Sequence, residues 1–218
     1  MKIAVLGTGM VGQAIGARLI ELGHTVMMGS RTANNDNAVS FVNKHPGGRA
    51  RAGTFAEAAS FGELVFNCTK GIESLNILKS TGEKNLDGKI LVDISNPLDF
   101  SKGMPPTLSV CNTDSLAEQI QATFPGLKVV KSLNTMNCSI MVNPGLVNGG
   151  DHHVFMSGND PEAKIEVSEI LKSFGWKAVN IIDLGDIKTA RGTEMMLPVW
   201  ISLFTSTGSG AFNFKIVR

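Results

Sequence analysis

Residues 2–12 read KIAVLGTGMVG, an apolar run that leads into three glycines. The spacing GxGxxG alone is weak, because glycine is common, but here an expected strand precedes it and an expected helix follows it. That order places a diphosphate at a helix N-terminus. Gly7 makes the tight turn, Gly9 lets the backbone approach the ligand, and Gly12 lets the helix lie close to the sheet. The segment therefore predicts a dinucleotide-binding fold.

Short β-branched or apolar runs alternate with amphipathic stretches along the rest of the chain. Such alternation is typical of βαβ units, so we expect an α/β, Rossmann-type, doubly wound and mainly parallel sheet. The expected strands cover residues 2–6, 25–28, 49–52, 64–68, 90–94, 129–133, 153–157 and 177–182.

Helices are expected where apolar residues recur every three or four positions. Two such sets are Val11, Ile15, Leu19 and Leu22, and Leu116, Ile120 and Phe124 after a cap at Asp114 or Ser115. A further helix is expected to begin at Asp160-Pro161 and to turn Ile165, Ile170, Leu171 and Phe174 inward. Residues 187–206 predict a long final helix that Pro198 kinks or interrupts.

No repeat, low-complexity tract or run of charge marks a linker in the sequence. We expect a nucleotide-binding core over residues 1–135 and a small C-terminal extension of helices and strands over 136–218, packed on that core. The boundary is soft, and one continuous domain is an alternative.

Composition excludes several classes of partner. Twenty basic and nineteen acidic residues leave a formal charge of +1, so we expect no nucleic acid and no anionic membrane as partner. The three cysteines form no CxxC pair, which favours a reducing, cytoplasmic compartment. We expect no signal peptide, and the apolar run 195–204 is shorter than the roughly 20 residues that span a bilayer.

The end of the second expected strand indicates which dinucleotide binds. An acidic residue there would hold a ribose 2′-hydroxyl and repel a 2′-phosphate. The sequence instead reads Gly29-Ser30-Arg31-Thr32, with no acid before Asp36. A guanidinium and two hydroxyls can donate to a phosphate, so NADP is favoured over NAD. The alternative is that Arg31 is a solvated turn residue.

Polar residues follow three later strands. Because a ligand lies at the carboxyl ends of parallel strands, these residues are candidates for contact with the nicotinamide ribose and carboxamide. They are Cys68, Thr69 and Lys70 after one strand, Asn96 and Pro97 after the next, and Asn134 and Thr135 after a third. Each is also a possible turn former or helix cap.

No side chain stands out as a catalytic group. No histidine lies near Cys68 in the sequence, so we interpret this cysteine as a small buried hydrophobe. His152 and His153 are adjacent and would point to opposite faces of a strand, which argues against a metal site. Hydride transfer needs neither, because the cofactor carries the chemistry and the protein supplies orientation.

These residues resemble the coenzyme F420-dependent NADP oxidoreductases and the related cytosolic domain of six-transmembrane metalloreductases. The similarity covers most of the chain. It rests on residues 3–12, on Gly29-Ser30-Arg31, on 92–98, on 129–135, and on Ala190-Arg191 followed by Trp200.

The resemblance implies that Thr8, Met10, Val11, Ser30 and Arg31 contact NADP(H). It also implies that a deazaflavin (coenzyme F420) or a flavin (FMN or FAD) stacks over the nicotinamide as the small-molecule acceptor, so that hydride passes directly between the rings. Residues 32–35 lack the basic side chain often found in the family, which predicts a lower affinity for the 2′-phosphate.

Two other functions stay open at this point. A dehydrogenase of a small carbonyl compound would want a general acid, yet the chain has no tyrosine, and Lys70 and Lys131 are the nearby lysines. A non-enzymatic NADPH sensor is the other.

The apolar segment 195–204 has three alternative roles: it could line the acceptor pocket, join the core, or form a dimer contact. We expect the protein to be a homodimer.

Overall fold

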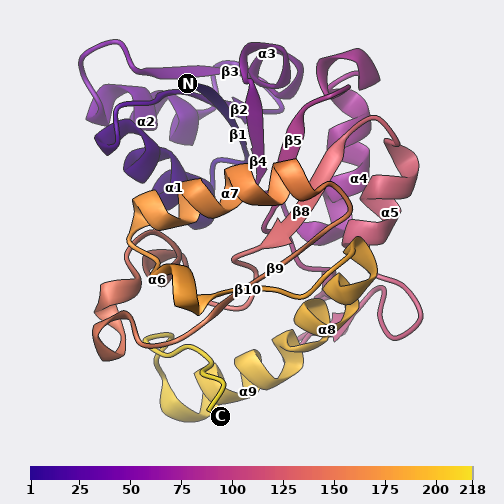
Figure 1. The fold of residues 1–218 in the computed structure, drawn as a ribbon. Helices are drawn as coiled ribbons and strands as arrows, with labels where there is room; N and C mark the ends of the chain where they lie inside the picture. The colour runs from indigo at the N-terminus through magenta and orange to yellow at the C-terminus, as the bar shows by residue number, and fades with distance from the viewer. Residues whose placement is uncertain (218) are drawn as a thin grey trace.

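The computed structural model describes residues 1–217, which build an eight-stranded sheet flanked by helices (Figure 1). The strand order is β10-β9-β8-β5-β4-β1-β2-β3, and every neighbouring pair is parallel except β8 and β9. The strands are β1 Lys2–Leu6, β2 Thr25–Ser30, β3 Ala50–Thr54, β4 Leu64–Asn67, β5 Ile90–Asp93, β8 Lys128–Ser132, β9 Val154–Gly158 and β10 Ile181–Asp183. This is the doubly wound α/β architecture that the sequence predicts.

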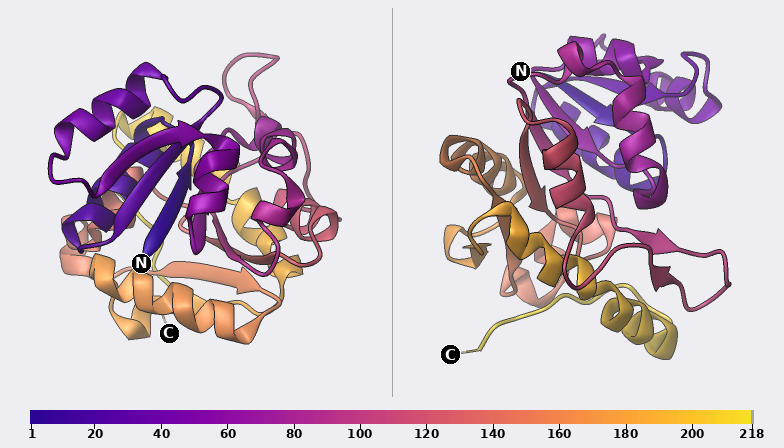
Figure 2. Two further views of the ribbon diagram at one scale, coloured as in Figure 1. Left: turned by 90° about the horizontal axis from the view of Figure 1, so that it is seen from above. Right: turned by 90° about the vertical axis from the view of Figure 1, so that its right-hand side faces the viewer.

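Helices cover both faces of the sheet (Figure 2). They are α1 Met10–Glu21, α2 Asp36–Lys44, α3 Phe55–Phe61, α4 Gly71–Ser80, α5 Leu116–Thr123, α6 Cys138–Val142, α7 Pro161–Phe174, α8 Ala190–Met195 and α9 Leu197–Thr207. Successive side chains of β1 enter different cores, since Ile3 and Val5 pack with α1, α2, α6 and α7, whereas Ala4 and Leu6 pack with α3, α4 and α5. Both faces are therefore closed to water.

Two elements depart from the sheet. A hairpin of β6 Leu98–Asp99 and β7 Thr107–Leu108 extends outward beyond β5, and Phe100 and Met104 in its loop are exposed (Figure 2). The C-terminal residues after α9 run back along 151–153, where Phe214 accepts a hydrogen bond from the backbone of His153 at 3.0 Å.

The expected strands are all present, with ends shifted by one or two residues except near residue 180. There the expected strand 177–182 is wrong in its first half, because Ala178–Asn180 form a 3₁₀ turn and β10 begins only at Ile181. The remaining short 3₁₀ turns are Glu83–Asn85, Pro144–Leu146, Asn148–Gly150 and Ile187–Thr189.

The expected helix over 187–206 is interrupted as predicted. Its residues form a 3₁₀ turn, α8 and α9, and Pro198 lies in the first turn of α9, where its missing N–H costs no intrahelical bond. Of the apolar segment 195–204, Leu197 and Ile201 join the core, whereas Val199 and Phe204 stay exposed. No helix within residues 1–217 has the length and apolarity to cross a membrane.

The inward position predicted for Ile165 is wrong. Its side chain is 57% exposed, because α7 buries the stripe that contains Ala163, Val167, Ile170 and Leu171. Ile165 lies two residues from both Ala163 and Val167, which on a helix of 3.6 residues per turn is the opposite face. Asp160 caps this helix, and Gly175 ends it in the left-handed conformation.

This difference in burial predicts a difference in stability. Leu171→Ala should lower the free energy of unfolding by about 2–5 kcal/mol, because it leaves a cavity in the core. Ile165→Ala should change it by less than about 0.5 kcal/mol. Urea titrations of both variants measure the two values, and equal losses would contradict the assigned orientation of α7.

Candidate functional site

The turn between β1 and α1 is held by close backbone contacts. Gly7 has a φ of +114°, and a Cβ built on it would lie 2.6 Å from the carbonyl oxygen of Cys68. A Cβ on Gly12 would lie 2.0 Å from the carbonyl oxygen of Gly7. Only glycine fits at these two positions, so the strand, the turn and the helix approach as closely as the motif predicts.

Gly9 occupies a different environment. A Cβ built there meets no atom within 4 Å, so the space beyond this residue is open. Gly9 is also the N-cap of α1, where no side chain caps the helix and no acidic residue lies in the first turn. The free N–H groups and the helix dipole make this open space suitable for an anion.

Two adjoining cavities extend from this turn along the carboxyl ends of the strands. The first, of about 300 Å³, is lined by Gly7, Thr8, Gly9, Ser30, Arg31, Asn35, Phe55, Cys68, Thr69, Lys70, Glu73 and Ile77. The second, of about 390 Å³, is lined by Ser30, Arg31, Thr54, Phe55, Ala56, Glu73, Asn76, Ile77 and Ser80. Five residues line both cavities, which therefore form one continuous cleft.

Eight of the residues predicted for the site line this cleft. They are Gly7, Thr8, Gly9, Ser30, Arg31, Cys68, Thr69 and Lys70. Eight others lie outside it: Met10, Val11, Gly12, Thr32, Asn96, Pro97, Asn134 and Thr135. Met10 is 81% exposed on α1, and Thr32 offers its backbone carbonyl to the hydroxyl of Ser30.

Several lining residues did not emerge from the sequence. Thr54 ends β3 and Phe55 directly follows it, so the rule applied to the other strand ends would have found them. Asn35 caps α2 through its side chain, a role that typically gives no sign of a ligand. Glu73 lies in the first turn of α4 and has no motif around it.

Arg31 is exposed and lies at the junction of the two cavities. Its guanidinium forms no ion pair with the described residues 1–217. It is therefore available to an anionic ligand, for which its planar set of donors is well suited.

Asn96 and Asn134 meet at the ends of β5 and β8. The side-chain amide of Asn96 donates to the backbone carbonyl of Asn134 at 2.9 Å, and the amide of Asn134 donates to Oδ1 of Asn96 at 2.9 Å. Two segments that are distant in the sequence thus form one neutral, hydrogen-bonded surface, which we call the asparagine edge. Pro97 and Thr135 are buried behind it.

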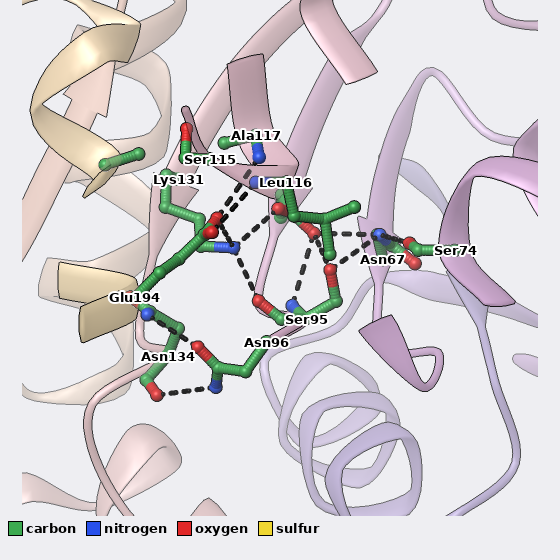
Figure 3. Close-up of polar contacts among 12 residues, drawn as sticks. Asn67, Ser74, Ser95, Asn96, Ser115, Leu116, Ala117, Lys131, Asn134 and Glu194 are labelled. Atoms are coloured by element: carbon green, nitrogen blue, oxygen red, sulfur yellow. Dashed lines mark hydrogen bonds and ion pairs between the residues drawn. The ribbon is translucent and has the colours of Figure 1, made fainter. Parts of the chain in front are cut away.

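A buried ionic cluster lies beside this edge (Figure 3). The Lys131 ammonium, with a fully buried side chain, contacts Asp93 Oδ2 at 2.8 Å and Glu194 Oε1 at 2.8 Å, and it donates to the carbonyl of Ser95 at 2.5 Å. Burial would lower the pKa of Lys131, but the two carboxylates outweigh it and raise this pKa. All three protons are engaged, so Lys131 is not free to act as a general acid.

Cys68 lies in the cleft but is not an activated thiol. Burial, followed by the negative charge of Asp93, raises its pKa well above the usual value, which disfavours the nucleophilic thiolate. Within residues 1–217, no group of three or more histidine, cysteine, aspartate or glutamate side chains is arranged to hold a metal ion.

Comparison with known proteins identifies the family. Residues 2–97 match the coenzyme F420-dependent NADP oxidoreductases. The crystal structure of a candidate F420-dependent NADP reductase from Arthrobacter sp. FB24 is 55% identical, with a TM-score of 0.94 over 100% of both chains. The chain belongs to this family. It is an NADP-dependent oxidoreductase, and the resemblance noted in the sequence is confirmed.

More distant relatives share parts of this arrangement. The rat metalloreductase STEAP3 is 29% identical over 204 residues, which cover 91% of this chain but only 38% of that protein. An imine reductase from Bacillus cereus BAG3X2 is 20% identical, with a TM-score of 0.66 over 95% of this chain and 62% of its own. The latter similarity shows a common fold.

The cleft of this NADP-dependent enzyme fits the dinucleotide on two observations. The space beyond Gly9 is open toward the free N–H groups of α1, and Arg31, which has no ion-pair partner among residues 1–217, lines the same cleft. A diphosphate and a 2′-phosphate would each find donor groups of opposite charge there.

The open space beyond Gly9 allows a selective test. Gly9→Val should fold normally, because no neighbour would clash with the new side chain, yet it should lose both NADPH and NADH by filling the space of the diphosphate. Fluorescence titration measures binding, and circular dichroism measures folding. Retained nucleotide binding in a folded Gly9→Val variant would contradict the assignment of this space to the diphosphate.

Proposed function

We propose that this enzyme transfers hydride directly between NADP(H) and a planar ring acceptor, a deazaflavin such as coenzyme F420 or a flavin. The observation that supports this proposal best is that the ammonium of Lys131 is fully hydrogen-bonded and cannot serve as a general acid. This ammonium lies beside the Asn96–Asn134 edge, but Asp93, Glu194 and a carbonyl occupy its three protons. Ring-to-ring hydride transfer suits such an edge, because it requires no side-chain acid.

The strand order supports a placement for NADP(H). Reading β2-β1-β4-β5-β8 across the sheet passes from Arg31 through the glycine turn to Asn96 and Asn134. The adenosine half would lie over β2 and β1, with its 2′-phosphate at Arg31. The nicotinamide half would lie toward the asparagine edge, where neutral amides suit an uncharged carboxamide and ribose.

The chain supplies orientation at this edge, whereas NADPH supplies the hydride when it is bound. Thr69 is fixed by a 2.7 Å hydrogen bond from its hydroxyl to Asn67 Oδ1, so its position in the cleft is set from inside the protein. Helix α8 adjoins the same edge, because Asn134 also donates to the carbonyl of Thr193 at 3.2 Å. The acceptor would approach between the asparagine edge and the C-terminal helices.

Family membership makes F420 the first acceptor to test. Protein should be titrated with NADPH and then mixed with F420, FMN or FAD while the absorbance of the reduced nicotinamide is followed. We expect decay with F420, whereas decay only with FMN or FAD would assign a flavin as acceptor. Binding of NADPH without decay for all three would contradict the proposal.

The role of Arg31 makes a prediction about nucleotide selectivity. Arg31→Ala should weaken NADPH binding by about 10- to 100-fold, because a charge-assisted hydrogen bond to phosphate contributes about 1.5–3 kcal/mol. NADH binding should change little, since NADH lacks the 2′-phosphate. Dissociation constants for both nucleotides test this, and equal losses would contradict the assigned role.

A further inference from the structure

We infer that Glu194 and Lys131 are positioning residues for hydride transfer. The buried ionic cluster that they form with Asp93 fixes the asparagine edge and docks α8 against it. The inference rests on the proposed function for the location of the nicotinamide. It assigns a kinetic role to residues that touch neither the nucleotide nor the acceptor.

Lys131 joins two strands at the point where both end. It comes from β8, three residues before Asn134, and it holds Asp93 at the end of β5 and the carbonyl of Ser95 in the following loop. The loop then continues directly into Asn96. Movement of the ammonium would therefore shift both asparagines relative to each other.

A chain of hydrogen bonds runs from this cluster to the cofactor cleft. Asp93 Oδ1 accepts from the amide of Asn67 at 2.8 Å and from the hydroxyl of Ser95 at 2.7 Å. The amide of Asn67 donates to Ser74 at 2.6 Å, and its Oδ1 holds the hydroxyl of Thr69. Thr69 lines the cleft, so the cluster and the candidate nucleotide site share one polar network.

Glu194 extends the network to the C-terminal half. Its carboxylate accepts from the backbone N–H groups of Leu116 at 2.8 Å and Ala117 at 3.1 Å, in addition to its contact with Lys131. The preceding residue, Thr193, accepts the hydrogen bond from Asn134. Two neighbouring residues of α8 thus fix this helix to β8 and to the start of α5.

The charge balance argues for a positional role. Two carboxylates surround one ammonium, and the N-terminal N–H groups of α5 offset the excess negative charge. A buried ionic cluster stabilises a fold no better than apolar side chains of similar volume. Its directional bonds, however, fix geometry, and small errors in the geometry of reacting groups reduce rates strongly.

Glu194→Gln tests this role while it preserves the Lys131–Asp93 pair. The amide nitrogen of glutamine cannot accept from Leu116 or Ala117, so α8 should shift from its position. We expect hydride transfer from NADPH to F420 to slow by about 10- to 100-fold in single-turnover measurements. The dissociation constant of NADPH should change less than about threefold, because the phosphate cradle and Arg31 lie on other strands.

Two further variants complete the test, one as a control outside the network and one as a second change within it. Lys164→Met removes the ion pair with Asp183 at 2.8 Å, which lies on the terminal strand β10 and shares no residue with the network, and it should leave transfer unchanged. Ser95→Ala keeps all three charges and removes one hydroxyl from the network. Like Glu194→Gln, it should slow hydride transfer. If Glu194→Gln fails to fold, Ser95→Ala alone tests the positioning role.

A second measurement does not depend on the acceptor. The fluorescence lifetime of bound NADPH reports the environment of the nicotinamide, and it should change in Glu194→Gln and Ser95→Ala but not in Lys164→Met. Wild-type transfer rates and lifetimes in the folded network variants would overturn the inference. The inference would also be overturned if these variants lost transfer rate and affinity for NADPH in equal proportion. A wild-type enzyme inactive with F420, FMN and FAD would contradict the proposed function alone, and the lifetimes would still test the positioning role.

Discussion

Burial of the Lys131 ammonium constrains the whole carboxyl edge of the sheet. Removing such a charge from water costs several kcal/mol unless partners surround it. Its partners come from β5, from the loop after β5 and from α8, so they meet only when these segments have assembled. Each partner is itself buried, and loss of Lys131 would leave two buried carboxylates without a cation. The C-terminal helices are therefore tied to the sheet edge by electrostatics as well as by apolar packing.

The two halves of the cleft use different physical means. At β1 and β2 the groups available to a ligand are backbone N–H donors and one exposed guanidinium, which need close chain approach and little burial. At β5 and β8 neutral amides form the edge, and the charges lie behind them, fully buried. The first arrangement favours affinity for phosphates. The second favours fixed geometry without placing a charge at the asparagine edge itself.

The sequence predicted what depends on local pattern. The glycine turn, the start of a helix at Asp160-Pro161 and all the strands apart from the first part of 177–182 follow from residues within a few positions of one another, and the structure confirms them. The orientation of Ile165 failed because several apolar residues of α7 compete for the inner face, and only packing decides among them. Lys131 was visible as a nearby lysine, but its partner Glu194 lies far along the chain in a segment with no motif.

Nucleotide recognition depends on local sequence motifs, whereas acceptor recognition depends on contacts between segments that are distant in the sequence. The family match covers residues 2–97, which include the glycine turn, Arg31 and the loop with Asn96. An imine reductase shares the fold at only 20% identity, so this framework tolerates extensive change in sequence. In the proposed placement the phosphates lie over β1 and β2, so the choice of acceptor would be made beyond β5. There, Thr193 of α8 accepts a hydrogen bond from Asn134 and Glu194 contacts Lys131, so a change in the C-terminal helices would alter the asparagine edge and the proposed acceptor side together.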